Sequence, residues 1–415
     1  MDARYLTLRP AFAFQFALAN AAAFAGCLPV LVILVPLKAR EVSPAYSSDV
    51  LSWSIMTGAL VASVVNILAG ALSDRTRTCI GRRKPWILVG ALCTVASFRL
   101  VHDAATVFQL ILSVVVLQAA FNMMLPALVA LLPDEVPHAR KGIMAALLAV
   151  GAPLGLGVGS FLISFEGLSF ANRFDISGCL MLLGILPLLA FWREDDVGRA
   201  PSGSVSTESV EFEAAPFLLN ERWKDFWRVW WSRLCIQIAF SIVQGYLLFY
   251  LISAQSHSGA IRNISPETLI GRLFMLSTGL SLFAALQVGA VTDRIGRRKI
   301  FVLGAGVFVG AGMMVMSVWP VLSGFIIGQV LYGVGVGLYS SAEVALAAEL
   351  LPEKSNSARD LGILNVGNAL PQAIAPGLAL LFLDEVLTGY RILFLTGALV
   401  AVLGGLAVMR VRTAR

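Results

Sequence analysis

Long apolar runs separated by short polar stretches make up almost the whole chain. A helix that crosses a bilayer needs about 20 consecutive, mostly apolar residues. Measured against that length, the sequence predicts twelve membrane spans. Their ranges are 10–36, 51–73, 86–102, 105–131, 142–165, 174–192, 229–253, 269–291, 300–318, 321–348, 361–383 and 388–409. The pattern therefore predicts an all-α polytopic membrane protein with two six-helix halves, residues 1–192 and 229–415. Residues 193–228, rich in acidic residues, Ser and Gly, are predicted to form the linker between them.

Composition agrees with a chain that is surrounded by lipid. Of the 415 residues, 58% are hydrophobic and 13% are charged, about half the charged share of an ordinary soluble domain. So few charges cannot cover a water-soluble protein of this size, whereas lipid accepts an apolar surface. The net charge of +6 lies in loops between apolar runs, so no nucleic-acid partner is expected. The expected partners are the lipid bilayer and a small-molecule substrate.

Lys and Arg residues are concentrated in alternate loops. If both termini lie on one side of the membrane, 23 of the 31 Lys and Arg residues fall on that side and seven on the other. Positive residues collect on the cytoplasmic side, so both termini and the linker are predicted to be cytoplasmic, in a plasma (inner) membrane. The first apolar stretch is too long for the core of a signal peptide and is interpreted as a retained span. We expect a monomer.

The two halves repeat each other in the same direction. Three pairs of segments match: residues 70–75 (GALSDR) with 289–294 (GAVTDR), 131–133 (LLP) with 350–352 (LLP), and 81–84 (GRRK) with 296–299 (GRRK). The first two pairs are offset by 219 residues and the third by 215, because the first loop is four residues longer. Two six-span halves related in this way are parallel repeats.

The paired loops resemble the signature loop of the major facilitator superfamily, which reads Gly, three residues, Asp-Arg, then Gly-Arg-Arg/Lys. The resemblance implies the major facilitator fold and transport by alternating access. Carboxylates at the ends of spans can pair with nearby arginines and latch the halves in one state; the alternative is that these loops only set the topology. The predicted gating residues are Asp74, Arg75, Arg82, Arg83, Asp293, Arg294, Arg297 and Glu349. Ala130 is the first-half equivalent of Glu349, and Asp134 or Glu135 is its candidate substitute.

The first of the two paired loops resembles one branch of the superfamily more specifically. Residues 73–78 (SDRTRT) and 81–86 (GRRKPW), together with glycine-rich residues 149–160 in span five, resemble the sucrose and glycoside symporter branch. This resemblance implies a sugar substrate and proton symport. The chain departs from that branch because the spans of its first half lack the expected embedded charges. Span one, for example, offers only Gln15 and Asn20.

A single acid lies deep in span ten. Glu343 is nine residues before Pro352, about 13 Å along a helix, and its repeat equivalent is Met124. Charged groups at such depth are costly and usually functional. We therefore predict that Glu343 is the coupling residue, as a protonation site or a direct substrate ligand. The alternative is a packing acid bonded to a neighbouring hydroxyl.

Stripes of amides, hydroxyls and aromatic rings run along four spans. Neutral donors and acceptors with tyrosine rings suit a sugar, and polar faces are costly in lipid. The predicted substrate-binding residues are Gln118 and Asn122 in span four, Gln237, Ser241 and Gln244 in span seven, Gln329, Tyr332 and Tyr339 in span ten, and Asn365 and Asn368 in span eleven, followed by Gln372. The alternative for each is an interhelical hydrogen bond.

The predicted function is secondary active transport of a small polar solute, a sugar or glycoside, with a proton or sodium as the coupling ion. The alternative is efflux of amphipathic drug-like or lipid-like compounds, because the Gly- and Pro-rich span five also resembles that of drug antiporters of the superfamily. A transport-dead sensor on the same fold stays open. No enzyme, cofactor or metal site is expected. The three histidines are expected in loops, the five cysteines have no metal-ligand spacing, and no phosphate-binding loop is present.

Overall fold

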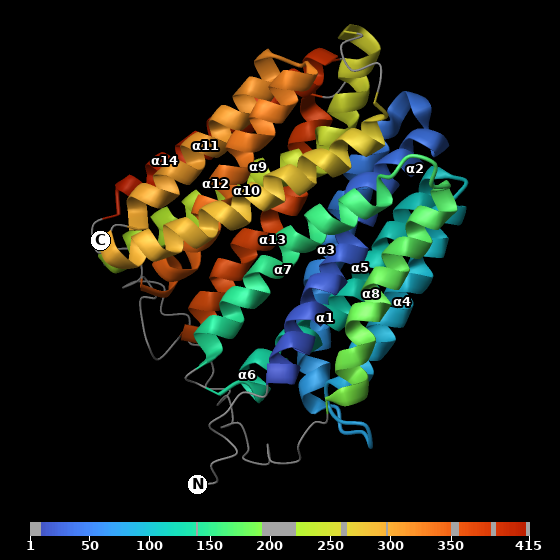
Figure 1. Cartoon of the computed structure of the whole chain (residues 1–415), viewed down its shortest axis with the longest axis vertical. Helices are drawn as coiled ribbons and strands as arrows, with labels where there is room; N and C mark the ends of the chain where they lie inside the picture. The colour runs from blue at the N-terminus through green and yellow to red at the C-terminus, as the bar shows by residue number, and fades with distance from the viewer. Residues whose placement is uncertain are drawn as a thin grey trace.

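The computed structural model describes residues 10–137, 140–192, 221–258, 264–295, 298–349, 357–382 and 387–411. Within these ranges the regular structure is helical apart from one isolated bridge between Thr78 and Gly81. The helices lie side by side as an elongated bundle (Figure 1). The all-helical polytopic fold predicted from the apolar runs is confirmed.

The first half begins with a long helix that a π-helical turn interrupts. The elements of this half are α1 (Pro10–Pro29), the π-helical turn η2 (Val30–Leu34), α2 (Val35–Val42), the 3-10 turn η3 (Pro44–Tyr46), α3 (Ser47–Arg75), α4 (Lys84–Asp103), α5 (Val107–Val129), the short α6 (Leu131–Glu135), α7 (Lys141–Ile163) and α8 (Phe170–Phe191). The first membrane segment therefore extends to Val42, beyond its predicted end at residue 36.

The second half consists of α9 (Glu221–Ser258), α10 (Pro266–Ile295), α11 (Arg298–Val318), α12 (Leu322–Glu349), α13 (Ser357–Phe382) and α14 (Leu387–Met409). α9 begins at Glu221, so the last eight residues of the predicted linker are helical. Residues 193–220 lie outside the described ranges. Eleven segments are long and apolar enough to cross a membrane within the described residues. α13 coincides with the twelfth predicted span, and the part of it whose side chains are described, Leu370–Phe382, is apolar.

The two halves are built by the same packing scheme. In the first half, α1 packs on α7 and α8, and α5 packs on α3 and α4; in the second, α9 packs on α13 and α14, and α12 packs on α10 and α11. Each of these six helices of the first half therefore has its counterpart in the second, as the repeated segments predict.

Glycines on α7 allow close packing within the first half. A Cβ atom built on Gly155 would lie 2.6 Å from the backbone nitrogen of Ala25 in α1, and one on Gly159 would lie 2.3 Å from the carbonyl oxygen of the same residue. Nearby, Asn20 donates a 2.9 Å hydrogen bond to the carbonyl of Leu148. A small-residue face is the usual basis of tight helix contact in lipid, where the hydrophobic effect does not drive association.

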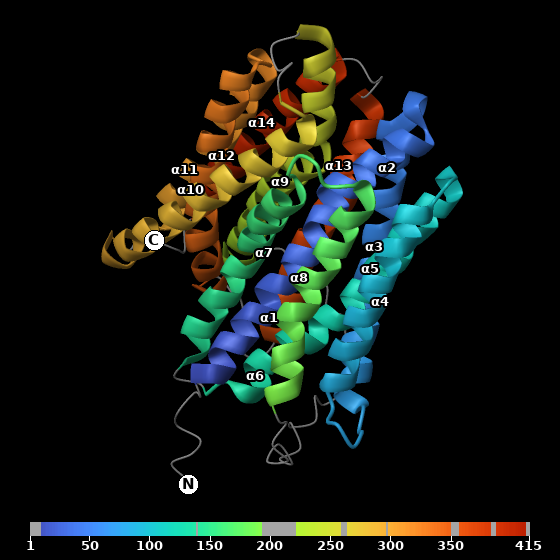
Figure 2. The same ribbon diagram turned by 45° about the vertical axis from the view of Figure 1, so that its right-hand side comes forward.

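The halves meet through α7 with α10 and α3 with α13. Figures 1 and 2 show α7 and α10 close together toward the end that carries α2, with their opposite ends apart. We call the first of these the contact end. The other, which carries α6 and the loop of residues 76–83, is called the hairpin end.

Candidate functional site

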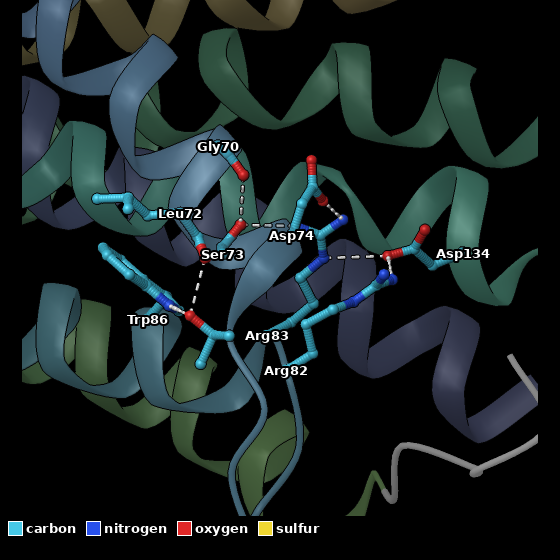
Figure 3. A network of polar contacts seen from close by, with 9 residues as sticks. Gly70, Leu72, Ser73, Asp74, Arg82, Arg83, Trp86 and Asp134 are labelled. Carbon is cyan, nitrogen blue, oxygen red and sulfur yellow. Dashed lines mark hydrogen bonds and ion pairs between the residues drawn. The ribbon is translucent and has the colours of Figure 1, made fainter. Parts of the chain in front are cut away.

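A buried arginine organises the hairpin end of the first half. Arg83, which precedes α4, is 5% exposed. Its Nη2 lies 2.5 Å from Oδ1 of Asp74 in the last turn of α3, and its Nε lies 3.0 Å from Oδ2 of Asp134 in α6. Its Nη1 donates a 2.6 Å hydrogen bond to Ser73. Arg82 adds a 2.8 Å ion pair to the same oxygen of Asp134 (Figure 3).

The loop of residues 76–83 holds Arg83 in this place. Gly81 has a φ of +112°, a conformation that glycine adopts readily, and it closes the loop against Thr78. Trp86 donates a 2.8 Å hydrogen bond to the hydroxyl of Thr76, which itself donates to the carbonyl of Leu72. The loop is thereby tied to both the end of α3 and the start of α4 (Figure 3).

This network joins helices of one half. All of the contacts just described for Asp74, Arg82 and Arg83 lie in the first half, with Asp134 as the shared acid. Arg75 lies exposed at the end of α3. The side chains of Asp293, Arg294 and Glu349, and the whole of Arg297, lie outside the described residues. Sequence reasoning named Asp134 only as a substitute, because the repeat offset pointed to Ala130.

Hydrogen bonds link the two halves at the contact end. The hydroxyl oxygens of Ser52 in α3 and Tyr246 in α9 lie 2.6 Å apart. Thr268, near the start of α10, donates a 2.8 Å hydrogen bond to the carbonyl of Ser164, which follows α7. Thr278 of α10 donates a 3.0 Å hydrogen bond to the carbonyl of Pro153 in α7. These bonds use uncharged groups on both sides.

Gly157 brings α10 close to α7. A Cβ atom on Gly157 would lie 2.4 Å from the hydroxyl oxygen and 2.6 Å from Cβ of Thr278. Gly271 of α10 is packed in a similar way against Ser164 and the carbonyl of Ser160. The approach of the two halves at this end therefore requires small residues at both positions.

The predicted substrate residues of the first half lie between α3 and α5. Asn122 donates a 2.9 Å hydrogen bond to the carbonyl of Gln118 and accepts a 3.3 Å hydrogen bond from Asn66 of α3. Gln118 is 7% exposed and packs beside Gly58. These contacts correspond to the interhelical alternative. Asn66 was not among the predicted residues, although it is the amide of span two.

Some of the predicted substrate-binding residues of α9 and α12 contact each other. Gln237, Ser241 and Gln244 are half-buried on α9, and Gln244 hydrogen-bonds Tyr332 of α12. On the same α9–α12 contact, the ring of Phe240 meets the rings of Tyr332 and Tyr339 edge to face, with centroids 5.7 and 5.5 Å apart. Phe240 was not predicted, because a phenylalanine in an apolar span carries no distinguishing signal.

The other predicted substrate-binding and coupling residues lie elsewhere, or only their backbone is described. Gln329 is completely buried, and its Nε2 lies 3.8 Å from the sulfur of Met316 in α11. The backbone positions of Glu343 in α12 and of Asn365 and Asn368 in α13 are helical, but their side chains lie outside those described. Gln372 is exposed. Among the described residues, no three His, Cys, Asp or Glu side chains are grouped to hold a metal ion.

Sequence comparison finds a family and several relatives. The family model of the Major Facilitator Superfamily matches residues 11–261 and 258–415. "D-xylose-proton symporter-like 1" of Arabidopsis thaliana is 34% identical over 166 residues, which are 37% of this chain and 32% of the relative. "Probable polyol transporter 4" of the same plant is 37% identical over 92 residues, 22% of this chain and 16% of the relative. The chain thus spans about a third or less of the length of these curated relatives.

Solved structures share the arrangement of helices. A mutant of the peptide transporter POT superimposes with a TM-score of 0.73 at 15% identity, covering 96% of this chain and 93% of that one. A mutant of the nucleoside transporter NupG gives 0.72 at 13% identity, covering 96% and 99%. At these identities the likeness concerns the fold alone.

Proposed function

Because the chain belongs to the Major Facilitator Superfamily, we propose that it is a secondary active transporter that moves a sugar or polyol across a membrane together with a proton. The observation that carries this proposal is the 34% identity to a relative named as a D-xylose-proton symporter-like protein. The repeated packing of the two halves supports alternating access, in which the halves rock about a site between them.

The state seen here is proposed to be open toward the cytoplasm. This rests on the excess of Lys and Arg in the loops at the hairpin end, which favours a cytoplasmic location for both termini in a plasma (inner) membrane. The three hydrogen bonds between the halves at the contact end are then the contacts that break when the protein opens outward. Interhelical bonds in membranes contribute about 0.6 kcal/mol each, so together they hold the closed end by about 2 kcal/mol. Binding of a solute can shift an equilibrium of this size.

Solute recognition is assigned to the uncharged polar groups of the second half. Gln237, Ser241 and Gln244 present amides and a hydroxyl on half-buried positions of α9. The contact of Gln244 with Tyr332 orients one of these amides. Asn365 and Asn368 on α13 are proposed to complete the site. Groups of this kind bind hydroxyls without requiring a charged solute.

Glu343 is proposed as the protonation site. It is an isolated acid in the apolar stretch of α12, where an ionised carboxylate is costly. A proton that arrives with the solute removes this cost. Sodium is the alternative coupling ion, and the uptake experiment below distinguishes it from a proton. We propose that the chain acts as a monomer, since its two halves supply both sides of the pathway.

The test is uptake of labelled xylose, sucrose and sorbitol into proteoliposomes that contain the purified protein. Accumulation is expected with an imposed proton gradient and not with a sodium gradient, and it should vanish when a protonophore is added. Sugar binding without counterflow would indicate a sensor on the same fold. Lack of sugar movement and binding under every gradient would contradict the proposal, and efflux of amphipathic dyes would then be measured.

A further inference from the structure

A hollow of about 170 Å³ lies between the two halves at the contact end. The first half contributes the end of α2 and the start of α3, and the second half contributes the end of α9 and the start of α14. Its polar lining consists of Arg40, Ser47, Ser253, Ser256, His257 and Tyr390. None of the described residues that line it is acidic.

Two of these groups lack a partner among the described residues. Ser253 is 8% exposed, and its hydroxyl has no hydrogen bond. Buried hydroxyls are nearly always bonded in native proteins, so the Ser253 hydroxyl is available to a ligand in the hollow. Arg40 is exposed and forms no ion pair with another described side chain; the neighbouring Glu41 is paired at 2.8 Å with Lys38.

His257 also lines the hollow. Its Nδ1 lies 2.9 Å from the carbonyl oxygen of Ser253. A carbonyl only accepts, so Nδ1 carries the proton, and Nε2 becomes a second donor only in the doubly protonated ring. Arg40 is therefore the permanent positive charge of the hollow.

From these groups we infer that the hollow binds a small tetrahedral oxyanion such as sulfate or inorganic phosphate. Guanidinium groups bind such anions through paired, charge-assisted hydrogen bonds, and the Ser253 hydroxyl supplies a further donor. Because Arg40 belongs to the first half and Ser253 to the second, the anion has both partners only while the contact end is closed. It therefore stabilises this state by mass action and slows a cycle that must pass through the opposite one.

The probe is sodium sulfate, compared with sodium chloride at equal ionic strength, on the purified full chain in detergent. Binding is measured by calorimetry and by the midpoint of thermal unfolding. Wild type is expected to bind sulfate in preference to chloride. Arg40→Gln should weaken sulfate binding about tenfold or more, as the loss of a hydrogen bond to a charged group predicts. Ser253→Ala should weaken it to a smaller extent.

Arg272→Gln is the matched control, because Arg272 is an exposed arginine of α10 that does not line the hollow; it should bind sulfate as wild type does. Gly157→Leu, whose side chain opposes closure of the contact end, should weaken sulfate binding although it leaves the hollow's residues intact. Equal responses to sulfate and chloride in wild type, or unchanged binding in a folded Arg40→Gln protein, would overturn the inference. Binding is measured without sugar, so its result is independent of the proposed solute.

Discussion

The hydroxyl of Tyr246 in α9 donates to Ser52 in α3 across the boundary between the halves. The direction follows from the second bond of Ser52, whose own proton goes to the carbonyl of Ser48 at 2.7 Å. Both side chains are completely buried. The bond is therefore a defined contact of the closed contact end, and it can be removed by deleting one oxygen atom.

Tyr246→Phe should shift the protein toward the state in which the contact end is open. Loss of about 0.6 kcal/mol corresponds to roughly a threefold change in the ratio of the two states. The ratio is measured by distance distributions between spin labels on the two halves at the contact end. Tyr250→Phe is the matched control, because Tyr250 donates to the carbonyl of Met316 within the second half; it should leave the distribution unchanged. Equal shifts in both variants would contradict the assignment.

Gly157→Ala should hinder closure of the contact end and slow transport several-fold. The added methyl would meet Thr278, whereas a methyl on Gly279 of the same region meets nothing within 4 Å. Gly279→Ala should therefore transport as wild type does. The double variant Gly157→Ala, Thr278→Ala should recover part of the rate, because it removes the clashing side chain. Initial uptake rates of the four proteins at matched reconstitution decide the outcome.

Arg83→Gln should destabilise the protein more than Arg82→Gln. Arg83 is buried and paired with two carboxylates whose side chains are 58% and 25% exposed. Solvent therefore screens these pairs in part, and the loss should fall between about 1 kcal/mol, as for a surface pair, and about 3 kcal/mol, as for a fully buried one. The side chain of Arg82 is 35% exposed, and pairs of that kind contribute about 1 kcal/mol at most. Thermal unfolding midpoints of the purified variants give the comparison. Similar losses in both would mean that burial of Arg83 does not set its contribution.

Glu343→Gln should uncouple solute movement from the proton gradient. The amide stands in for the protonated acid, so exchange of solute down its own gradient should persist while gradient-driven accumulation is lost. Asp175→Asn is the control and should retain accumulation, because Asp175 is an exposed acid of α8 outside the proposed site. If Glu343→Gln accumulates solute as wild type does at every pH gradient, the acid has a packing role.

The repeat could be predicted from sequence because equivalent loops keep their residues and two of the three matched pairs share one offset. The acid that completes the hairpin network could not be located by the same offset. It lies four residues beyond Ala130, about one helical turn, on the short helix α6. The contact partners of the amides could not be predicted either, because spacing along a helix does not reveal which neighbour the polar face meets. Asn122 is satisfied by Asn66 on α3, whereas Gln244 contacts Tyr332 on α12.

α9 is a continuous helix of 38 residues, about 57 Å long at 1.5 Å per residue and nearly twice the thickness of a bilayer core. Tyr246 and the hollow that Ser253 lines lie toward its C-terminal end. Its N-terminal end, at Glu221, follows the predicted linker between the halves. A rigid rod of this length works as a lever. A tilt of 10° about its midpoint displaces each tip by about 5 Å in opposite directions. Small rotations inside the membrane are thereby converted into movements large enough to close one mouth of the pathway while widening the other.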